Sequence, residues 1–412
     1  MDYLTKRRDK FSKLLLDDSV VVLYAGSLVK KSEDQYYDFS VNRNFYYLFN
    51  IDQDSSISVI IKSGNTVFTH LFIKEDIVSL WVEKSLSKEE ASELSNIEIK
   101  NIHFLDEFYP FLSSVLEISR RSITSGISNI YFDIAKNEET NQAQIMSKYP
   151  YLVRKEAYSL ITSLRRYKDK EEIFNIETAI SITKEAIENA VHALANGICE
   201  EKEVEAFYNF ILNLYGLKPS FETIMASGEN ATTLHYTKND SEISEGSLLL
   251  CDLGVCYKNY ASDISRTYPS SGKFSPRQKE IYEIVLKANK ETIAWVKPGV
   301  SFKEFLDFGK DILAKECVKI GLINEESEIS KYYYHGLGHY LGLDVHDVGL
   351  YNTPFKEGIV ITVEPGLYIK EEKIGIRIED DILITKDGCR VLSKDIEKEV
   401  DDIEKLMEQF KL

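Results

Sequence analysis

The chain has 412 residues, of which 43% are hydrophobic and 28% charged, as in ordinary globular proteins long enough for two domains. Its formal net charge of −17 at pH 7 argues against nucleic acid and anionic membranes as partners, because both select basic surfaces. We expect a cytoplasmic protein without a membrane span, because no run of about 18 apolar residues occurs and the cysteines are scattered without a CxxC pair.

The first part of the chain, residues 1–160, alternates strand-like and helix-like segments, which is typical of a compact α/β domain. Runs of apolar residues predict strands at 20–26, 57–63, 66–73 and 129–134. Helical patterns occur at the N-terminus, over 107–118 and over 138–148. The domain is expected to end near residue 160, where a long charged helical stretch begins.

The remaining residues, 161–412, show two helices followed by a strand pair, and this order occurs twice. Capping signals and helical spacing predict helices over 169–194, over 201–215, from Ser275 onward and over 301–320. Strands are predicted at 222–228, as a hairpin within 246–268, and at 359–363, 367–369, 374–378 and 382–385. The segments 169–267 and 276–385 therefore suggest a pseudo-symmetric duplication with a site at its seam.

Potential metal ligands recur along this second part of the chain. They are Asp252 in LLLCDLG, Asp263 in YASDISRT, His339 in HGLGHYLGLDVHD, Glu364 in ITVEPGLY and Glu379 in GIRIEDDILIT. Four carboxylates and one imidazole suit Mn²⁺, Fe²⁺, Co²⁺ or Zn²⁺, and two ions fit four carboxylates better than one does. Because such a site can activate water against a carbonyl or phosphoryl group, the sequence predicts a metallohydrolase.

The acidic residues differ in their local patterns. Asp252 ends a buried-looking apolar run, and Asp263 lies across the predicted hairpin from it. Two facing carboxylates repel each other, so a cation between them explains both. In contrast, we expect Asp380 and Asp381 to be solvated charges on an edge strand.

The histidines are concentrated near the second half of the predicted site. His335, His339 and His346 lie within twelve residues in a run punctuated by glycines, which favours function over a role in the core. Arg377 and Glu379 are two residues apart and are expected to share one strand face.

These motifs resemble the pita-bread metallopeptidases, which include methionine aminopeptidase, prolidase and aminopeptidase P. HGLGHYLGLDVHD matches the proline-peptidase signature, and the stretches ASGENATTLHY and SDISRTYPSSGKFSPRQ resemble aminopeptidase P most. The similarity extends over nearly the full chain. NRNFYYLFNI resembles a family segment ending in Tyr-Leu-x-Gly, with Asn50 in place of Gly. Because Asn tolerates positive φ better than most residues, the turn is expected to survive.

The resemblance implies a fold and a reaction. The fold is an α/β N-terminal domain (1–160) followed by an α+β pita-bread, creatinase/aminopeptidase-like catalytic domain (161–412) with pseudo-two-fold symmetry. The reaction is hydrolysis of the bond between an N-terminal residue and a following proline, with two divalent ions, Mn²⁺ first among them. In the family pattern Asp252 binds one ion, Asp263 and Glu379 bridge both, and His339 and Glu364 hold the second.

The resemblance also implies roles for residues beside the metals. His235, in TLHY, and His346 would flank the substrate carbonyl and stabilise its oxyanion. His335 and Arg377 would shape the proline subsite. Glu364 would carry the proton to the leaving proline nitrogen.

A homodimer or larger homo-oligomer, built by the N-terminal domain, is a further implication. Trp81 lies where the family places a tryptophan that can reach a neighbouring subunit's active site, although the glycine that usually follows it is missing here. A tryptophan of the core is the other interpretation of Trp81.

Three alternatives remain open from the sequence. A prolidase would use the same site for Xaa-Pro dipeptides alone. Creatinase-like hydrolysis works without metals, which the complete ligand set argues against. A non-catalytic peptide-binding module on this fold would be expected to have lost ligands.

Overall fold

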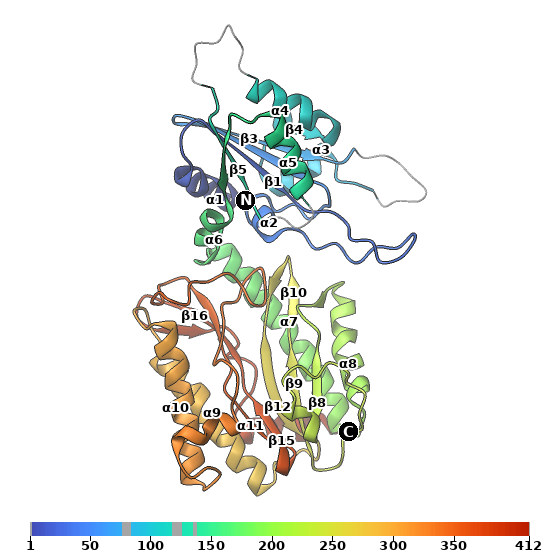
Figure 1. The fold of residues 1–412 in the computed structure, drawn as a ribbon. Coiled ribbons are helices and arrows are strands. Elements are labelled where there is room, and N and C mark those ends of the chain that lie inside the picture. Colours follow the sequence, from blue (N-terminus) through green and yellow to red (C-terminus); the bar gives the residue numbers. More distant parts are fainter. Residues whose placement is uncertain (1, 76–83, 118–125, 135–137, 412) are drawn as a thin grey trace. The chain divides into compact units, whose positions relative to one another are not determined.

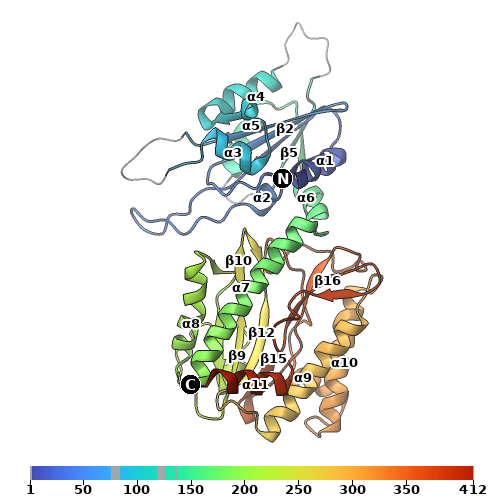
Figure 2. The same ribbon diagram turned by 180° about the vertical axis from the view of Figure 1, so that it is seen from behind.

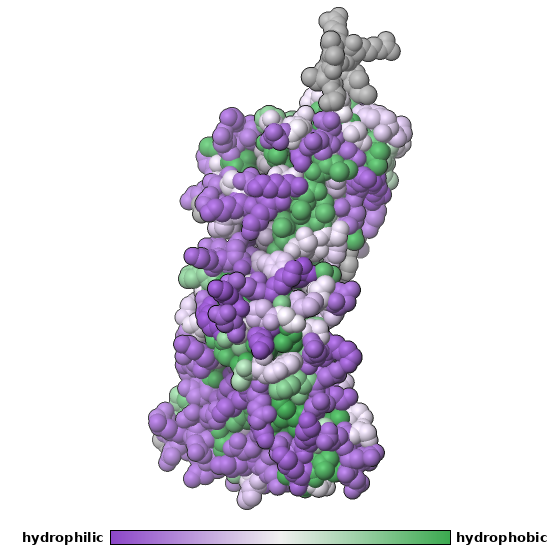
Figure 3. Space-filling model, turned by 90° about the vertical axis from the view of Figure 1, so that its left-hand side faces the viewer, coloured by the Kyte–Doolittle hydropathy of each residue, from purple (hydrophilic) through white to green (hydrophobic). Residues whose placement is uncertain are grey.

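The computed structural model describes residues 2–75, 84–117, 126–134 and 138–411, so Trp81 lies outside the described residues. The chain divides into two compact units, Met1–Arg165 and Arg166–Leu412 (Figure 1). Hydrophilic side chains dominate the face drawn in Figure 3, and apolar side chains form small patches between them. None of the helices in the described ranges has both the length and the hydropathy that crossing a lipid bilayer requires.

The first unit is built around a six-stranded sheet in the order β4-β3-β2-β1-β5-β6. Its strands are β1 (Ser19–Tyr24), β2 (Ile57–Ser63), β3 (Thr66–Ile73), β4 (Ile102–Phe104), β5 (Asn129–Phe132) and β6 (Val153–Glu156). Its helices are α1 (Asp2–Leu14), α2 (Arg43–Phe49), α3 (Lys88–Ser95), α4 (Phe108–Leu116), α5 (Glu139–Lys148) and α6 (Tyr158–Arg165). Because alternate side chains of a strand share one face, Val20 and Val22 of β1 join Leu112 of α4 and Ile145 of α5 in one buried cluster. The expected α/β fold of this part is confirmed.

The turn at Asn50 survives the exchange of glycine for asparagine. Asn50 ends helix α2 in the left-handed conformation, with φ 53° and ψ 31°. Its backbone N–H donates to the carbonyl of Tyr46 at 2.8 Å, which satisfies one of the last free carbonyls of the helix.

In the second unit, a layer of helices covers one side of the strands, as the opposite views in Figures 1 and 2 show. The helices are α7 (Lys170–Ala195), α8 (Glu201–Leu214), α9 (Pro276–Trp295), α10 (Phe302–Lys319) and α11 (Val400–Phe410). The strands are β7 (Lys218–Pro219), β8 (Ile224–Ser227), β9 (Leu248–Leu253), β10 (Val255–Tyr257), β11 (Tyr260–Ala261), β12 (Ile264–Pro269), β13 (Val360–Val363), β14 (Gly366–Ile369), β15 (Ile374–Arg377), β16 (Asp380–Ile384) and β17 (Cys389–Val391). The order of two helices followed by strands therefore occurs twice, as predicted.

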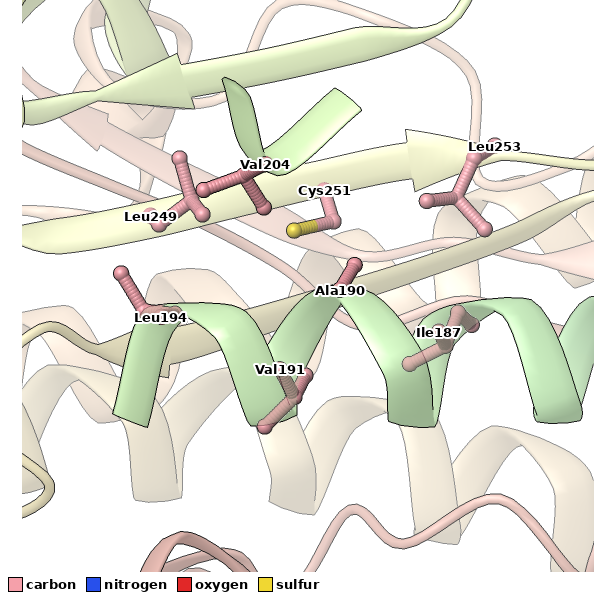
Figure 4. A pocket seen from close by; sticks show the side chains of 8 residues that line it. All are labelled: Ile187, Ala190, Val191, Leu194, Val204, Leu249, Cys251 and Leu253. Atoms are coloured by element: carbon pink, nitrogen blue, oxygen red, sulfur yellow. The ribbon is translucent and has the colours of Figure 1, made fainter. Parts of the chain in front are cut away.

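Helix α7 packs on strand β9 and sets the direction of Asp252. Figure 4 shows side chains of α7, α8 and β9 gathered in one apolar layer: Ile187, Ala190, Val191, Leu194, Val204, Leu249, Cys251 and Leu253. Because side chains alternate along a strand, Cys251 faces the helices and Asp252 faces the opposite side, away from them. Burial of the apolar face thus fixes the carboxylate on the other face.

The two halves of this unit meet where β12 runs beside β15. The backbone N–H of Glu379 donates to the carbonyl of Ser265 at 3.0 Å. The Thr267 hydroxyl lies 3.2 Å from the Arg377 carbonyl and 3.3 Å from its amide nitrogen. This seam brings the segment after β11, with Asp263, beside the segment after β15, with Glu379.

The expectation that Asp380 and Asp381 are solvated is wrong. Strand β16 lies between β13 and β17 rather than at an edge, and both side chains are fully buried. Asp380 is paired with Arg266 at 2.8 Å and with Lys398 at 2.5 Å. The sequence does not show this pairing, because Arg266 and Lys398 lie far from Asp380 along the chain.

Candidate metal centre

Three predicted ligands form a tight cluster at the seam. Asp263, His339 and Glu379 each offer one ligand atom, and these atoms all lie within 4.8 Å of one another. The Nε2 atom of His339 is 3.3 Å from Oδ2 of Asp263 and 3.6 Å from Oε1 of Glu364. Two acidic side chains and an imidazole therefore converge on one point, with Glu364 beside them.

His339 is oriented as a metal ligand would be. Its Nδ1 lies 3.1 Å from the carbonyl oxygen of Tyr340, which favours the tautomer with the proton on Nδ1. That tautomer leaves the Nε2 lone pair free toward Asp263 and Glu364. Histidine ligands commonly donate their other N–H to a carbonyl in this way.

Asp252 and Glu379 each present one buried oxygen with no hydrogen-bond partner in the described part of the chain. Their second oxygens are satisfied, since Asp252 Oδ2 accepts from Arg377 at 2.6 Å and Glu379 Oε2 accepts from Ser265 at 2.8 Å. A buried oxygen without a partner is costly, and a cation is the partner that a carboxylate oxygen prefers. The residues present therefore fit divalent ions.

The electrostatics of the cluster point the same way. Burial and the neighbouring carboxylates raise the pKa of Asp263 and Glu379 well above their ordinary values. Burial is also the main cause that raises the pKa of Glu364 to about 7, although His339 and Arg377 lower it in part. Bound divalent cations would reverse these shifts by favouring the ionised carboxylates.

The register of the hairpin decides which acids face each other. Ser265 of β12 stands opposite Asp252 of β9, so Asp263 lies two residues further along. The chain passes closely here, because a Cβ on Gly254 would lie 1.9 Å from the carbonyl oxygen of Ser262. The backbone therefore requires a glycine at position 254.

Glycine also brings His339 to the cluster. The His339 carbonyl accepts from the Thr362 N–H at 2.9 Å, and the Leu337 carbonyl accepts from the Glu364 N–H at 2.8 Å. A Cβ on Gly338, between them, would lie 2.1 Å from the Thr362 carbonyl oxygen. The segment therefore pairs with β13 like an extra strand, which only a glycine at position 338 allows.

All of the predicted site residues that lie in the described ranges line one cleft of about 820 Å³: His235, Asp252, Asp263, His335, His339, His346, Glu364, Arg377 and Glu379. The imidazole rings of His339 and His346 are 4.1 Å apart. Burial is the main cause that lowers the pKa of His346, and the neighbouring His339 and His235 lower it further. The cleft thus places His235 and His346 beside the cluster without making them part of it.

His335 belongs to a polar chain that the sequence did not reveal. Its Nε2 lies 2.8 Å from the Tyr368 hydroxyl, and Arg377 donates to the same hydroxyl at 3.0 Å. Burial and Arg377 lower the pKa of His335 to about 4, so its imidazole is neutral. Tyr368 was missed because an aromatic residue in a short apolar strand reads as core.

Asp381, which was expected to be a solvated charge, instead lies beside the cluster. Its Oδ2 accepts a hydrogen bond from the backbone N–H of Asp263 at 3.1 Å, directly behind the cluster. Burial raises its pKa well above the ordinary value. Its place between the buried strands β13 and β17 would have been the signal, and the sequence does not show that pairing.

A bulge forms another wall of the cleft. Ile224 pairs with Asp252 and Pro219 with Val255, so residues 220–223 stand opposite residues 253–254 alone. The extra residues bend the strand and re-aim its side chains, as bulges beside active sites do. As a result Phe221 and Glu222 line the cleft.

Comparisons with known proteins identify the family of the chain. Residues 175–386 match metallopeptidase family M24, and residues 4–124 match the aminopeptidase P N-terminal domain. A Xaa-Pro aminopeptidase of Escherichia coli strain K12 is 32% identical over 440 residues, covering 98% of this chain and 96% of that protein. A Xaa-Pro dipeptidase of Pyrococcus horikoshii is 35% identical over 360 residues, covering 84% of this chain and 94% of that protein.

A solved structure agrees as well. A proposed aminopeptidase P from Bacillus anthracis has a TM-score of 0.94 and 42% identity, covering 100% of this chain and 99% of that chain. The resemblance drawn from the motifs and the two-part fold are thereby confirmed. The chain is a member of metallopeptidase family M24, with an N-terminal domain of the aminopeptidase P type.

Proposed function

We propose that this protein is a metal-dependent Xaa-Pro aminopeptidase, which hydrolyses the bond between an N-terminal residue and a following proline. The observation that carries the proposal is the buried cluster of Asp263, His339 and Glu379 at a cleft with room for a peptide. Similarity over nearly the full length to a Xaa-Pro aminopeptidase supports the choice of substrate.

The proposed metal content is two divalent ions, with Mn²⁺ the first candidate and Co²⁺, Fe²⁺ or Zn²⁺ as others. Asp252 would hold one ion, Asp263 and Glu379 would bridge both, and His339 and Glu364 would hold the second. The unpartnered oxygens of Asp252 and Glu379 support this assignment. Bound ions would supply Lewis-acid activation of water and of the scissile carbonyl.

The remaining residues would bind and orient the peptide. His235 and His346 would donate hydrogen bonds to the oxyanion that develops on the substrate carbonyl. His335 and Arg377, linked through Tyr368, would form a rigid wall for the proline ring. Glu364 would deliver a proton to the proline nitrogen as the bond breaks.

The second candidate function is that of a prolidase, and the similarity to a Xaa-Pro dipeptidase is the observation that supports it. One assay separates the two and tests the proposal itself. Arg-Pro-Pro, Arg-Ala-Ala and the dipeptide Arg-Pro would be incubated with the protein in metal-free buffer and with added Mn²⁺. Metal-dependent cleavage of Arg-Pro-Pro, with far slower cleavage of Arg-Ala-Ala, is the expected result.

Other outcomes of the same assay are equally clear. Cleavage of Arg-Pro alone would establish the prolidase alternative. Comparable rates on Arg-Pro-Pro and Arg-Ala-Ala would refute the proline subsite. Binding of Arg-Pro-Pro without cleavage at any metal concentration would favour a non-catalytic peptide-binding module.

We also propose that the chain forms a homodimer or larger homo-oligomer through its N-terminal domain and works in the cytoplasm. Light scattering should then give at least twice the chain mass of 47.3 kDa. Trp81 is proposed to lie at a substrate entrance. Trp81→Ala should raise KM for tripeptides without unfolding the protein, whereas loss of folding would assign Trp81 to the core.

A further inference from the structure

A buried ion pair lies behind the segment that carries His346. Lys168 Nζ is 2.8 Å from Oδ2 of Asp347, and both side chains are only 1% exposed. Lys168 stands two residues before the start of helix α7, and Asp347 directly follows His346 in the sequence. Asp347 ends the HGLGHYLGLDVHD motif, but the sequence analysis assigned no role to either residue of this pair.

His346 depends on its backbone for its position. Residues 342–349 form neither helix nor strand, and the His346 side chain is exposed at the cleft. Within the described ranges, no hydrogen bond to another residue holds the His346 imidazole, whose ring lies 4.1 Å from that of His339. The backbone of residues 342–349 therefore determines the direction of the His346 ring.

The loop is fastened at the next residue. Asp347 donates its backbone N–H to the Tyr340 carbonyl at 2.8 Å, while its carboxylate turns inward to Lys168. Lys168 in turn donates its own backbone N–H to the Gly358 carbonyl at 2.8 Å. Asp347 thus joins the loop both to the strand-like segment of His339 and to the start of α7.

The surrounding chain is packed closely around this pair. A Cβ on Gly342 would lie 2.2 Å from Oδ2 of Asp347 and 2.8 Å from Cε of Lys168, so only glycine leaves room. A buried ion pair is a poor device for stability, because desolvation offsets most of the attraction. The contact between Lys168 and Asp347 depends on direction, however, so it fixes the positions of the two segments that carry them.

We infer that Lys168 and Asp347 are positioning residues that hold His346 at the reacting carbonyl. The inference rests on the proposed function, in which His346 donates to the oxyanion. A Lys168→Met variant keeps the length of the side chain but leaves the Asp347 carboxylate without this cation. The loop then relaxes, and the His346 imidazole loses its alignment.

The activity test is a double-mutant cycle on Arg-Pro-Pro with Mn²⁺. Lys168→Met should lower kcat by about tenfold or more, with KM and bound Mn²⁺ nearly unchanged. In a His346→Ala background the same substitution should change kcat by less than about twofold, because the group it positions is already gone. An equal loss in both backgrounds would show a general structural effect and overturn the inference.

Two further variants serve as controls. Lys287→Met removes the ion pair with Glu316 on the surface of the same unit, at 2.6 Å, and should leave kcat unchanged. If Lys168→Met does not fold, the neutral pair Lys168→Met/Asp347→Asn takes its place, since it leaves no charge buried. Full activity of a folded neutral pair would also overturn the inference.

A second measurement does not depend on activity. Hydrogen exchange of a peptide covering residues 340–349 should be faster by about tenfold or more in Lys168→Met, and unchanged in Lys287→Met. Unchanged exchange in both variants would refute the anchor even in an active enzyme. A wild type that cleaves no Xaa-Pro peptide would refute the proposed function, and faster exchange would then still establish the anchor.

Discussion

Two consecutive buried carboxylates, Glu379 and Asp380, are treated in opposite ways. Burial would raise the pKa of Asp380, but Arg266 and Lys398 hold it well below its ordinary value. Burial together with Asp263 raises the pKa of Glu379 well above its ordinary value. Asp380 pairs with two cationic side chains of the chain itself, Arg266 and Lys398. The carboxylates around Glu379, which face the cleft, have too few such partners. We call the surroundings of Asp380 the first region and the cleft carboxylates around Glu379 the second region. The second region therefore suits cations bound from solution.

The largest expected effect comes from removing a carboxylate of the second region. Asp263→Ala should lower kcat/KM by about 1000-fold or more, because a bridging ligand serves both proposed ions and each contributes several kcal/mol. Peptide cleavage and bound Mn²⁺ would be measured on the same sample. Asp401→Ala, whose side chain is 91% exposed, is the control. Full metal content in Asp263→Ala would contradict the bridging role.

The first region should respond in stability instead. Asp380→Asn leaves the fully buried guanidinium of Arg266 without its counter-ion, and breaking such a pair lowers the free energy of unfolding by about 3–5 kcal/mol. Urea denaturation of the metal-free protein measures this loss. Asp307→Asn, which removes an exposed partner of Lys303, should leave the free energy of unfolding nearly unchanged. If Asp380→Asn were as stable as the wild type, the assigned structural role would be wrong.

The same two regions mark how far the sequence could predict the molecule. Asp252, Asp263, His339, Glu364 and Glu379 could be proposed as ligands from their motifs and from the family resemblance that these motifs carry. Asp380 could not, because its partners Arg266 and Lys398 are 114 and 18 residues away along the chain. The sequence predicts the role of a side chain where the local pattern determines that role. It does not predict pairing between residues that are far apart along the chain.

Contacts that depend on register were also beyond the sequence. The polar chain through Tyr368 joins His335 to Arg377 across the strands β14 and β15, and a one-residue slip would separate them. The hairpin was predicted, but not that Ser265 rather than Asp263 stands opposite Asp252. The α/β character of the first unit followed from its periodicity, and the pita-bread fold of the second followed from the resemblance of its motifs to the family.

The histidines at the mouth of the second region should act on the transition state. His346→Ala and His235→Ala should each lower kcat by about 100-fold, the usual loss for one oxyanion donor, with bound Mn²⁺ unchanged. His192→Ala, on α7 beside Phe410, is a matched control that should keep full kcat. Loss of metal from either cleft variant would instead make that histidine a ligand.

The smallest expected effect is a pH dependence that separates the regions. A carboxylate with a raised pKa stabilises the fold below its unfolded value of 4.5 and loses that contribution as pH rises through the folded value, about 7 for Glu364. The Tm of the metal-free protein should fall by about 5–10 °C from roughly pH 5 to pH 8, and Mn²⁺ should abolish the fall. The lowered pKa of Asp380 matters only as pH falls below 3.8, so it adds no slope in this range. A flat Tm in metal-free buffer would contradict the contrast between the regions.

The most direct test is the metal content of the wild-type protein. Protein saturated with Mn²⁺ near neutral pH and freed of excess metal would be submitted to elemental analysis. The proposed centre predicts a plateau at about two equivalents of Mn²⁺ per chain. A firm plateau at none would contradict the claim that this cluster of buried carboxylates is built to hold cations.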